Sequence, residues 1–191
     1  MIEAMANRVA EYVAGNDETA DREVIAYGAG LLIMAVVNYS LVLASALLLG
    51  VLREMLAAIG AFILMRSTIG GCHANNRVTC FITYSGIMYL SILMASFVTL
   101  SWSAALALYT ANMALIILYA PGDTAEQPMV RNLLTRKIFG MVFLSGLFAL
   151  PAFFGEFQSE INILLFVATW TCVLLHQLVY KAYGCKRSRD K

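Results

Sequence analysis

Long apolar segments separated by short polar ones constrain the fold of this chain more than any other feature. A helix that crosses a bilayer needs about 20 predominantly apolar residues, because each residue advances it by roughly 1.5 Å. Segments of this kind recur along the chain, at Val24–Leu49, Val51–Met65, Cys80–Leu100, Trp102–Ala120, Ile138–Phe154 and Ile161–Tyr180. They predict an all-α integral membrane protein built as a bundle of six transmembrane helices.

The amino-acid composition also indicates a protein that lies in a lipid bilayer. Of the 191 residues, 61% are hydrophobic and 13% are charged, whereas soluble domains are nearer half apolar and a quarter charged. A soluble fold of this size has too much surface to hide that many apolar side chains, so a lipid bilayer is the first predicted partner. The net charge of +1 argues against a nucleic-acid binder, which needs a basic surface to neutralise phosphates.

The second apolar segment leaves two topologies open. Val51–Met65 is short and begins with the charged pair Arg53 and Glu54. It spans the bilayer if those two long side chains reach a headgroup layer. The alternative is a re-entrant segment, which gives five full spans.

The N-terminal region has a different pattern. Residues 2–14 alternate apolar and polar side chains at spacings of three and four, which predicts a short amphipathic helix. It lies in the membrane interface or packs as a surface helix on the bundle. We therefore expect one membrane domain, with an interfacial helix and linker at 1–23, the bundle at 24–180 and a basic cytoplasmic tail at 181–191.

The basic residues predict the orientation. With six spans and a cytoplasmic N-terminus, 12 of the 13 lysines and arginines fall on the inner side, and only Arg53 falls outside. Cytoplasmic loops carry such an excess. The prediction is a multi-pass cell-membrane protein with both termini in the cytoplasm. The stretch Arg66–Thr79 and the loop Pro121–Lys137 then share the cytoplasmic face.

The segment RSTIGGCHANNRVTC, residues 66–80, holds the residues best suited to chemistry. On one continuous helix His73 and Cys80 would lie about 10 Å apart along the axis, but a base must come within roughly 3 Å of the proton it accepts. Catalysis by this pair therefore requires a bend, and we expect Cys80 to open the third helix, where the dipole stabilises a thiolate. The residues alone leave the alternative of an interfacial histidine beside a structural cysteine. Cys72, His73 and Cys80 supply three zinc ligands at most, so no metal and no cofactor is predicted.

Two motifs resemble those of the accessory gene regulator protein B family. The first is the arginine, Gly-Gly-x-His and later cysteine of residues 66–80. The second is YAPGDT at 119–124, followed by Pro128 and the basic pair Arg136-Lys137. The resemblance covers essentially the whole chain.

The resemblance implies a membrane cysteine endopeptidase, a hydrolase that processes a quorum-sensing propeptide at the cytoplasmic face. The family's catalytic residues correspond to Cys80 and His73. The substrate is an amphipathic propeptide with a charged tail. The cysteine holds its central segment as a thioester, and a thiol or hydroxyl of that segment then closes a cyclic thiolactone or lactone.

Other polar residues have two interpretations each. Arg66 orients a carboxylate or anchors the second span. Gly70 and Gly71 offer N–H groups to an oxyanion hole or only form the turn. Asp123 and Asn75 are equal candidates for a third catalytic residue.

The basic residues of the later loop could bind an acidic substrate tail or only follow the positive-inside rule; they are Arg131, Arg136 and Lys137. Further polar residues are expected to be structural: His176, Cys172 and Cys185, with Asn38, Asn112 and Asn162 as interhelical hydrogen-bonding residues.

Two rival functions remain. A small-peptide transporter or exporter should hold ionisable residues deep inside its spans, and here these are nearly absent. A non-catalytic membrane scaffold is the second rival. A homodimer is compatible with a helical bundle and is left open by the sequence.

Overall fold

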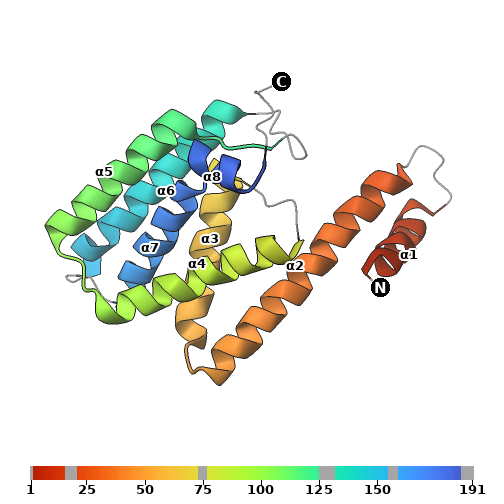
Figure 1. The fold of residues 1–191 in the computed structure, drawn as a ribbon, viewed down its shortest axis with the longest axis horizontal. Coiled ribbons are helices and arrows are strands. Elements are labelled where there is room, and N and C mark those ends of the chain that lie inside the picture. The colour runs from red at the N-terminus through yellow and green to blue at the C-terminus, as the bar shows by residue number, and fades with distance from the viewer. Residues whose placement is uncertain (1, 16–20, 73–76, 125–131, 155–158, 186–191) are drawn as a thin grey trace. The chain divides into compact units, whose positions relative to one another are not determined.

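A computed structural model describes residues 2–15, 21–72, 77–124, 132–154 and 159–185. All of the regular structure in these ranges is helical apart from an isolated β-bridge. The helices, labelled in Figure 1, are α1 (Ile2–Ala14), α2 (Arg22–Leu48), α3 (Leu52–Ile69), α4 (Arg77–Phe97), α5 (Trp102–Tyr119), α6 (Leu133–Phe154), α7 (Ser159–Val173) and α8 (Gln177–Ala182).

The chain forms two compact units, Met1–Gly50 and Val51–Lys191. The first is a helical hairpin in which α1 packs on α2. Alanines at every fourth position of α1, namely Ala6, Ala10 and Ala14, are buried, and they let the two backbones approach closely. The larger apolar side chains of α1, among them Tyr12 and Val13, are exposed.

The second unit has α3 and α7 at its centre. Helix α7 contacts α3, α4, α5 and α6, and Figure 1 shows α5, α6 and α7 side by side. A helix that is apolar on all sides is stable only when it is surrounded, and nine of the 15 residues of α7 are buried. Helix α3 is buried along one face, from Met55 through Met65 to Ile69.

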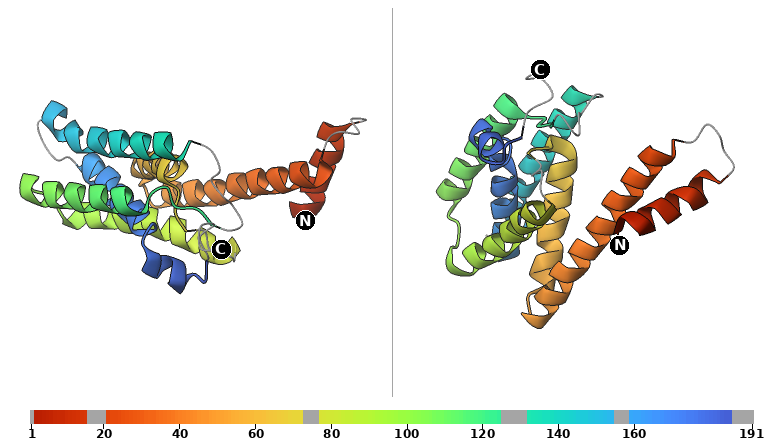
Figure 2. Two further views of the ribbon diagram at one scale, coloured as in Figure 1. Left: turned by 90° about the horizontal axis from the view of Figure 1, so that it is seen from above. Right: turned by 45° about the vertical axis from the view of Figure 1, so that its right-hand side comes forward.

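Among the described residues, four helices are long and apolar enough to cross a membrane: α2, α4, α5 and α6. Helix α7 is apolar but has 15 residues, and α3 carries Arg53, Glu54 and Arg66 within its 18 residues. The structure therefore supports a multi-pass membrane protein, and the count of six spans stays a prediction. Figure 2 presents the same bundle from two further directions.

The last apolar segment differs from its predicted form. The sequence predicted one helix over Ile161–Tyr180, but α7 ends at Val173 and α8 begins at Gln177. The break occurs where the His176 side chain caps α8 by accepting a hydrogen bond from the N–H of Leu178 at 3.2 Å. A side-chain acceptor at this position satisfies an N–H that has no partner within the helix.

Buried polar side chains join neighbouring helices. Asn112 of α5 donates to Thr169 of α7 at 2.8 Å, which confirms the interhelical role predicted for this asparagine. Asn162 reaches the carbonyl of Val98 at 3.5 Å. These contacts pair the side-chain amide N–H groups of the two asparagines, for which lipid offers no partner, whereas Oδ1 of Asn162 has no hydrogen-bond partner among the described residues.

A close approach of α3 and α6 gives the first prediction. A Cβ added at Gly140 would lie 2.3 Å from Cγ2 of the fully buried Ile69, whereas a Cβ at Gly146 of the same helix would meet no atom within 4 Å. Both Gly→Ala changes gain about 1 kcal/mol of helix propensity, but overpacking costs about 1–3 kcal/mol. Gly140→Ala should lower the apparent Tm in detergent micelles, and Gly146→Ala should leave it equal or higher. Equal behaviour of the two variants would contradict the packing described.

Candidate active site

The site begins at the C-terminal end of α3, where two glycines turn the chain. Gly70 caps the helix with a φ of 72°, and its N–H donates to the carbonyl of Arg66 at 3.0 Å. Gly71 has a φ of 128°, and a Cβ there would lie 2.3 Å from Nη1 of Arg66. Glycine is therefore favoured at position 71 by the backbone angle, and a larger residue would also displace the end of the Arg66 side chain.

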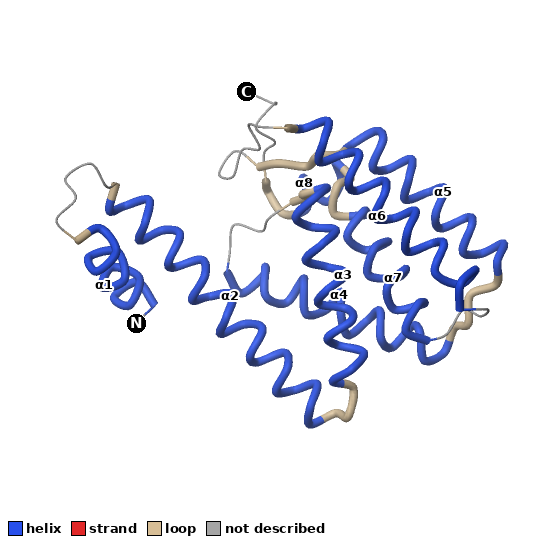
Figure 3. Tube along the Cα trace, turned by 180° about the vertical axis from the view of Figure 1, so that it is seen from behind, coloured by secondary structure: helices blue, strands red, loops and turns tan. Residues whose placement is uncertain are grey.

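The two sequence motifs meet immediately after this turn. The N–H of Gly71 donates to the carbonyl of Gly122 at 2.9 Å, and the N–H of Gly122 donates to the carbonyl of Ile69 at 2.8 Å. The pairing forms a parallel bridge between Gly70 and Gly122. A Cβ on Gly122 would lie 2.9 Å from both N and Cα of Gly71, so only glycine permits the contact. In Figure 3 these loop segments lie together at one end of the second unit.

Arg66 holds the turn from the side of α3. Its Nη1 donates to the carbonyl of Gly70 at 3.2 Å, and its Nη2 donates to the carbonyl of Cys72. A guanidinium suits this task because its donors diverge in a fixed plane. Arg66 thus secures the backbone that leads into His73.

The backbone N–H groups of Gly70 and Gly71 form hydrogen bonds within the turn in this structure. Gly70 donates to Arg66 and Gly71 donates to Gly122, so each N–H has a carbonyl partner within the protein. The oxyanion role considered for them stays a prediction that requires these bonds to open.

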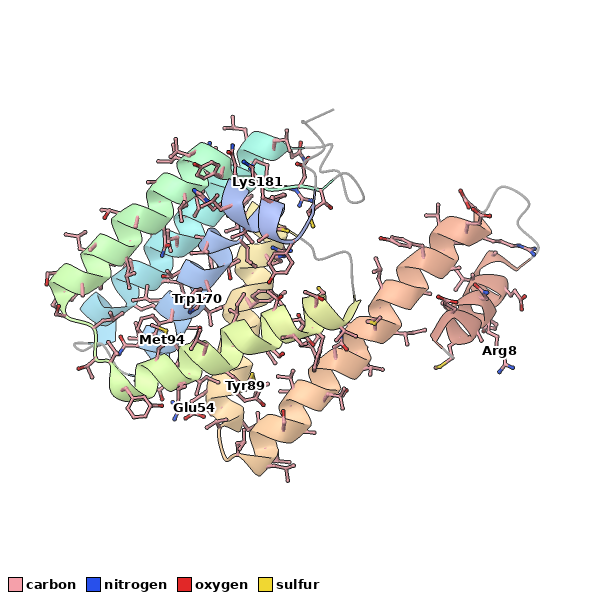
Figure 4. The ribbon with its side chains drawn as sticks, in the orientation of Figure 1. Arg8, Glu54, Tyr89, Met94, Trp170 and Lys181 are labelled. Carbon is pink, nitrogen blue, oxygen red and sulfur yellow. The ribbon has the colours of Figure 1, made fainter. Side chains whose placement is uncertain are left out.

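Helix α8 covers the bridged motifs. The N–H of Cys72 donates to the carbonyl of Leu174 at 3.1 Å. A Cβ on Gly122 would meet the buried Tyr180 hydroxyl at 2.8 Å, and the Tyr183 hydroxyl hydrogen-bonds Thr83 of α4 at 2.7 Å. Figure 4 labels Lys181 of α8 at this end of the second unit and Glu54 at the other.

Helix α8 was not predicted as part of the site. His176 was expected to be structural; its side chain caps α8, and its ring packs edge-on against Tyr119, with 5.3 Å between the ring centroids. The signal in the sequence is a polar side chain that interrupts an apolar segment, followed by Gly184, which is typical of a helix end.

Cys80 lies in this neighbourhood at the start of α4. It is the fourth residue of the helix and is partly exposed, so α4 begins three residues before the cysteine that was expected to open it. Thr83, one turn further, makes the contact with Tyr183. His73, Asn75 and Arg131 lie outside the described residues, so the predicted pairing of His73 with Cys80 stays a prediction.

Cys72 lies near Cys80 and is buried. Burial raises the pKa of the Cys72 thiol to about 12, the neighbouring Cys185 thiol adds to this rise, and the Arg66 guanidinium opposes it. The thiolate is the nucleophilic form of cysteine. Cys72 is therefore protonated near neutral pH and is a poor nucleophile.

The basic pair after the second motif contacts helix ends. Arg136 donates to the carbonyl of Ser67, in the last turn of α3, at 3.2 Å, and Lys137 donates to the carbonyl of Ile117, near the end of α5, at 2.5 Å. Terminal carbonyls lack partners within the helix and carry partial negative charge. Both residues therefore stabilise the ends of the helices that lead into the bridge.

The acidic candidate of the second motif is buried beside the bridge. Asp123 and Thr124 have 6% and 5% of their surface exposed. Among the described residues, no group of three histidine, cysteine, aspartate or glutamate side chains is arranged to hold a metal ion.

Comparison with known proteins gives one family and one relative. The sequence model of the family "Accessory gene regulator B" matches residues 4–175. A protein of Clostridium acetobutylicum, named provisionally as AgrB-like, is 28% identical over 98 residues, which are 51% of this chain and 47% of the relative. The aligned region thus spans about half the length of that relative. No solved structure matches the chain.

The bridge between the glycines gives the second prediction. Gly122→Ala should separate the two motifs and uncover Cys72, which is 6% exposed, so N-ethylmaleimide should label Cys72 several-fold faster than in the unaltered protein. The fully buried Cys172 serves as an internal standard, measured by mass spectrometry of peptides. Gly86→Ala, where a Cβ meets no atom within 4 Å, is the matched control. An unchanged labelling rate in Gly122→Ala would show that the bridge does not cover Cys72.

Proposed function

Because this chain belongs to the accessory gene regulator B family, we propose that it is a membrane cysteine endopeptidase that processes an amphipathic propeptide into a cyclic signalling peptide. The observation that supports the proposal is the meeting of the two motifs at the end of α3, near Cys80, which is the fourth residue of α4. The family suggests a role in peptide processing, and the proposed reaction of Cys80 with His73 supplies a chemistry for it.

Cys80 is the nucleophile in this mechanism, and His73 is its base. His73 accepts the thiol proton as the sulfur attacks the peptide bond that precedes the charged tail. A tetrahedral intermediate forms. His73 then returns the proton to the departing amine, the C–N bond breaks, and the central segment stays on Cys80 as a thioester.

Ring closure releases the product. A thiol or hydroxyl within the bound segment attacks the thioester carbonyl, and the Cys80 sulfur leaves with the proton. Exchange between two thioesters is nearly isoenergetic, so the energy of the acyl-enzyme is kept for the ring. Water competes for the same carbonyl, and a site at the lipid boundary limits its access.

The other three cysteines are less suited to this role. Cys172 is fully buried within α7, and Cys72 is buried and protonated. Cys185 lies after α8. Cys80 is partly exposed and is the fourth residue of α4.

The bridged turn contributes rigidity. Arg66 and Gly122 hold the backbone up to Cys72 with four hydrogen bonds, and His73 follows directly. Catalytic groups act best when their supports are fixed, because misplacement by 1 Å can cost about 100-fold in rate. We propose that the bridge supplies this support for the histidine.

The acidic tail of the propeptide is proposed to bind Arg131, Arg136 and Lys137. Arg136 and Lys137 already contact carbonyls at the ends of α3 and α5. Because a carbonyl is neutral, both side chains keep their positive charge and can still attract a carboxylate of the substrate tail. We propose that the site lies at the cytoplasmic face with both termini on that side, because cytoplasmic loops carry an excess of basic residues.

Substitution of the reacting residues gives the third prediction. With purified protein in liposomes and a propeptide that has an amphipathic leader, a central cysteine and an acidic tail, Cys80→Ala should abolish cleavage and the hydroxylamine-sensitive acyl-enzyme. His73→Ala should slow cleavage by about 10²–10⁴-fold, the usual contribution of a general base.

Cys172→Ala is the control, because it removes a thiol that faces the bundle interior, and it should cleave at the unaltered rate. Helical content by circular dichroism should be equal in all variants. Cleavage retained by Cys80→Ala would exclude the mechanism.

A double-mutant cycle gives the fourth prediction. Exposed ion pairs contribute about 0.2–1 kcal/mol, so Arg136→Gln should lower kcat/KM by roughly 2–5-fold with an acidic tail and by less when the tail glutamates are replaced by glutamines. Subtracting the loss measured with the glutamine tail from the loss measured with the acidic tail removes any effect caused by the contact of Arg136 with Ser67. Lys181→Gln, an exposed basic residue of α8, should lower kcat/KM equally for both tails. Equal losses for Arg136→Gln with both tails would assign this arginine a structural role only.

A further inference from the structure

Two hydroxyl groups join the C-terminal end of α8 to the start of α4, the helix that bears Cys80. The Tyr183 hydroxyl lies 2.7 Å from the Thr83 hydroxyl. The Thr83 hydroxyl also donates to the carbonyl of Thr79, the residue before Cys80, at 2.8 Å. Because a threonine hydroxyl has a single proton to donate, the Tyr183 hydroxyl is the donor to Thr83. The two hydrogen bonds therefore form a chain from α8 to the backbone next to Cys80.

Tyr183 occupies a well-fixed helix end. It is the C-cap residue of α8, and its side chain is half-buried. The N–H of Gly184 donates to the carbonyl of Lys181 at 3.2 Å, and the N–H of Cys185 donates to the carbonyl of Tyr180 at 2.9 Å. This pair of bonds is the Schellman arrangement that ends many helices. The tyrosine therefore reaches α4 from a helix end that its own backbone holds in place.

The C-terminal segment that carries α8 also contacts the turn after α3. The N–H of Cys72 donates to the carbonyl of Leu174, between α7 and α8, at 3.1 Å. The buried Tyr180 hydroxyl lies against Gly122, where an added Cβ would meet it at 2.8 Å. The turn after α3 leads to the proposed base, and the start of α4 bears the proposed nucleophile. The segment of α8 therefore contacts both of the supports on which the proposed reacting pair depends.

We propose that Tyr183 is a positioning residue for Cys80, an inference that rests on the proposed peptidase function. Its hydroxyl holds the start of α4 in a fixed position relative to the turn after α3, which keeps the sulfur in reach of its base. A helix start needs such a contact because its first N–H groups have no partner within the helix and its residues fray. The family match ends at residue 175, so Tyr183 lies beyond it.

Cleavage kinetics of the full chain in liposomes, with the propeptide described above, test the proposal. Tyr183→Phe removes the donor, and Thr83→Val removes the acceptor. Each should lower kcat by about 10-fold with little change in KM, since a misplacement of 1 Å can cost about 100-fold in rate. The double variant should lose no more than either single variant, because both changes break the same chain of hydrogen bonds. Thr83→Ser keeps the hydroxyl and should rescue kcat relative to Thr83→Val.

Tyr109→Phe is the matched control. The Tyr109 hydroxyl of α5 hydrogen-bonds Ser145 of α6 at 3.0 Å, so the change removes the same kind of bond between two other helices of the same unit. It should leave kcat unaltered. An unaltered kcat in Tyr183→Phe, an equal loss of kcat in Tyr109→Phe, additive losses in the double variant, or an effect confined to KM would each overturn the proposal.

Amide hydrogen exchange in detergent micelles gives a readout that needs no cleavage. Peptides that cover residues 79–85 should exchange several-fold faster in Tyr183→Phe than in the unaltered protein, because the start of α4 then opens more often. The same peptides should exchange at the unaltered rate in Tyr109→Phe. Unaltered exchange in Tyr183→Phe would overturn the proposal. If Cys80→Ala retains cleavage, the proposed function fails while the difference in exchange persists, so the two failures are distinguishable.

Discussion

The short backbone pairing between Gly71 and Gly122 is the contact on which the rest of the site depends. Two amides donate across it, and neither residue could carry a side chain without collision. A buried N–H or C=O left without a partner costs about 1–3 kcal/mol, and more where lipid replaces water. The pairing therefore supplies hydrogen-bond partners to the N–H and C=O groups of an irregular stretch of backbone. Without such partners this stretch would be unstable at the end of a membrane bundle.

The surrounding contacts act on the same few residues. Arg66 approaches the turn from α3, Arg136 and Lys137 hold the ends of α3 and α5, and α8 covers the opposite side. Each contributes hydrogen bonds to carbonyls or a close packing contact. Together they give the loops of this bundle end the fixed geometry that a reacting pair of side chains needs.

The sequence predicted the helices well and the site in outline. The apolar segments anticipated α2, α4, α5 and α6, because hydropathy over about 20 residues reports burial in lipid directly. The two motifs were expected on one face, and the structure brings Gly71 and Gly122 into contact. Helix α8 was missed because its cap is made by the His176 side chain, a local hydrogen bond that an apolar pattern does not reveal.

By itself the sequence determined the class of the protein: a helical membrane chain with a Gly-Gly turn, a cysteine at a helix start and a basic loop, all properties carried by neighbouring residues. Only the tertiary structure decided which distant groups share that bundle end. It paired the two glycine segments and placed α8 over them. The physical reason is that helix formation and membrane partition are set by local composition, whereas hydrogen bonds between loops depend on how whole helices pack.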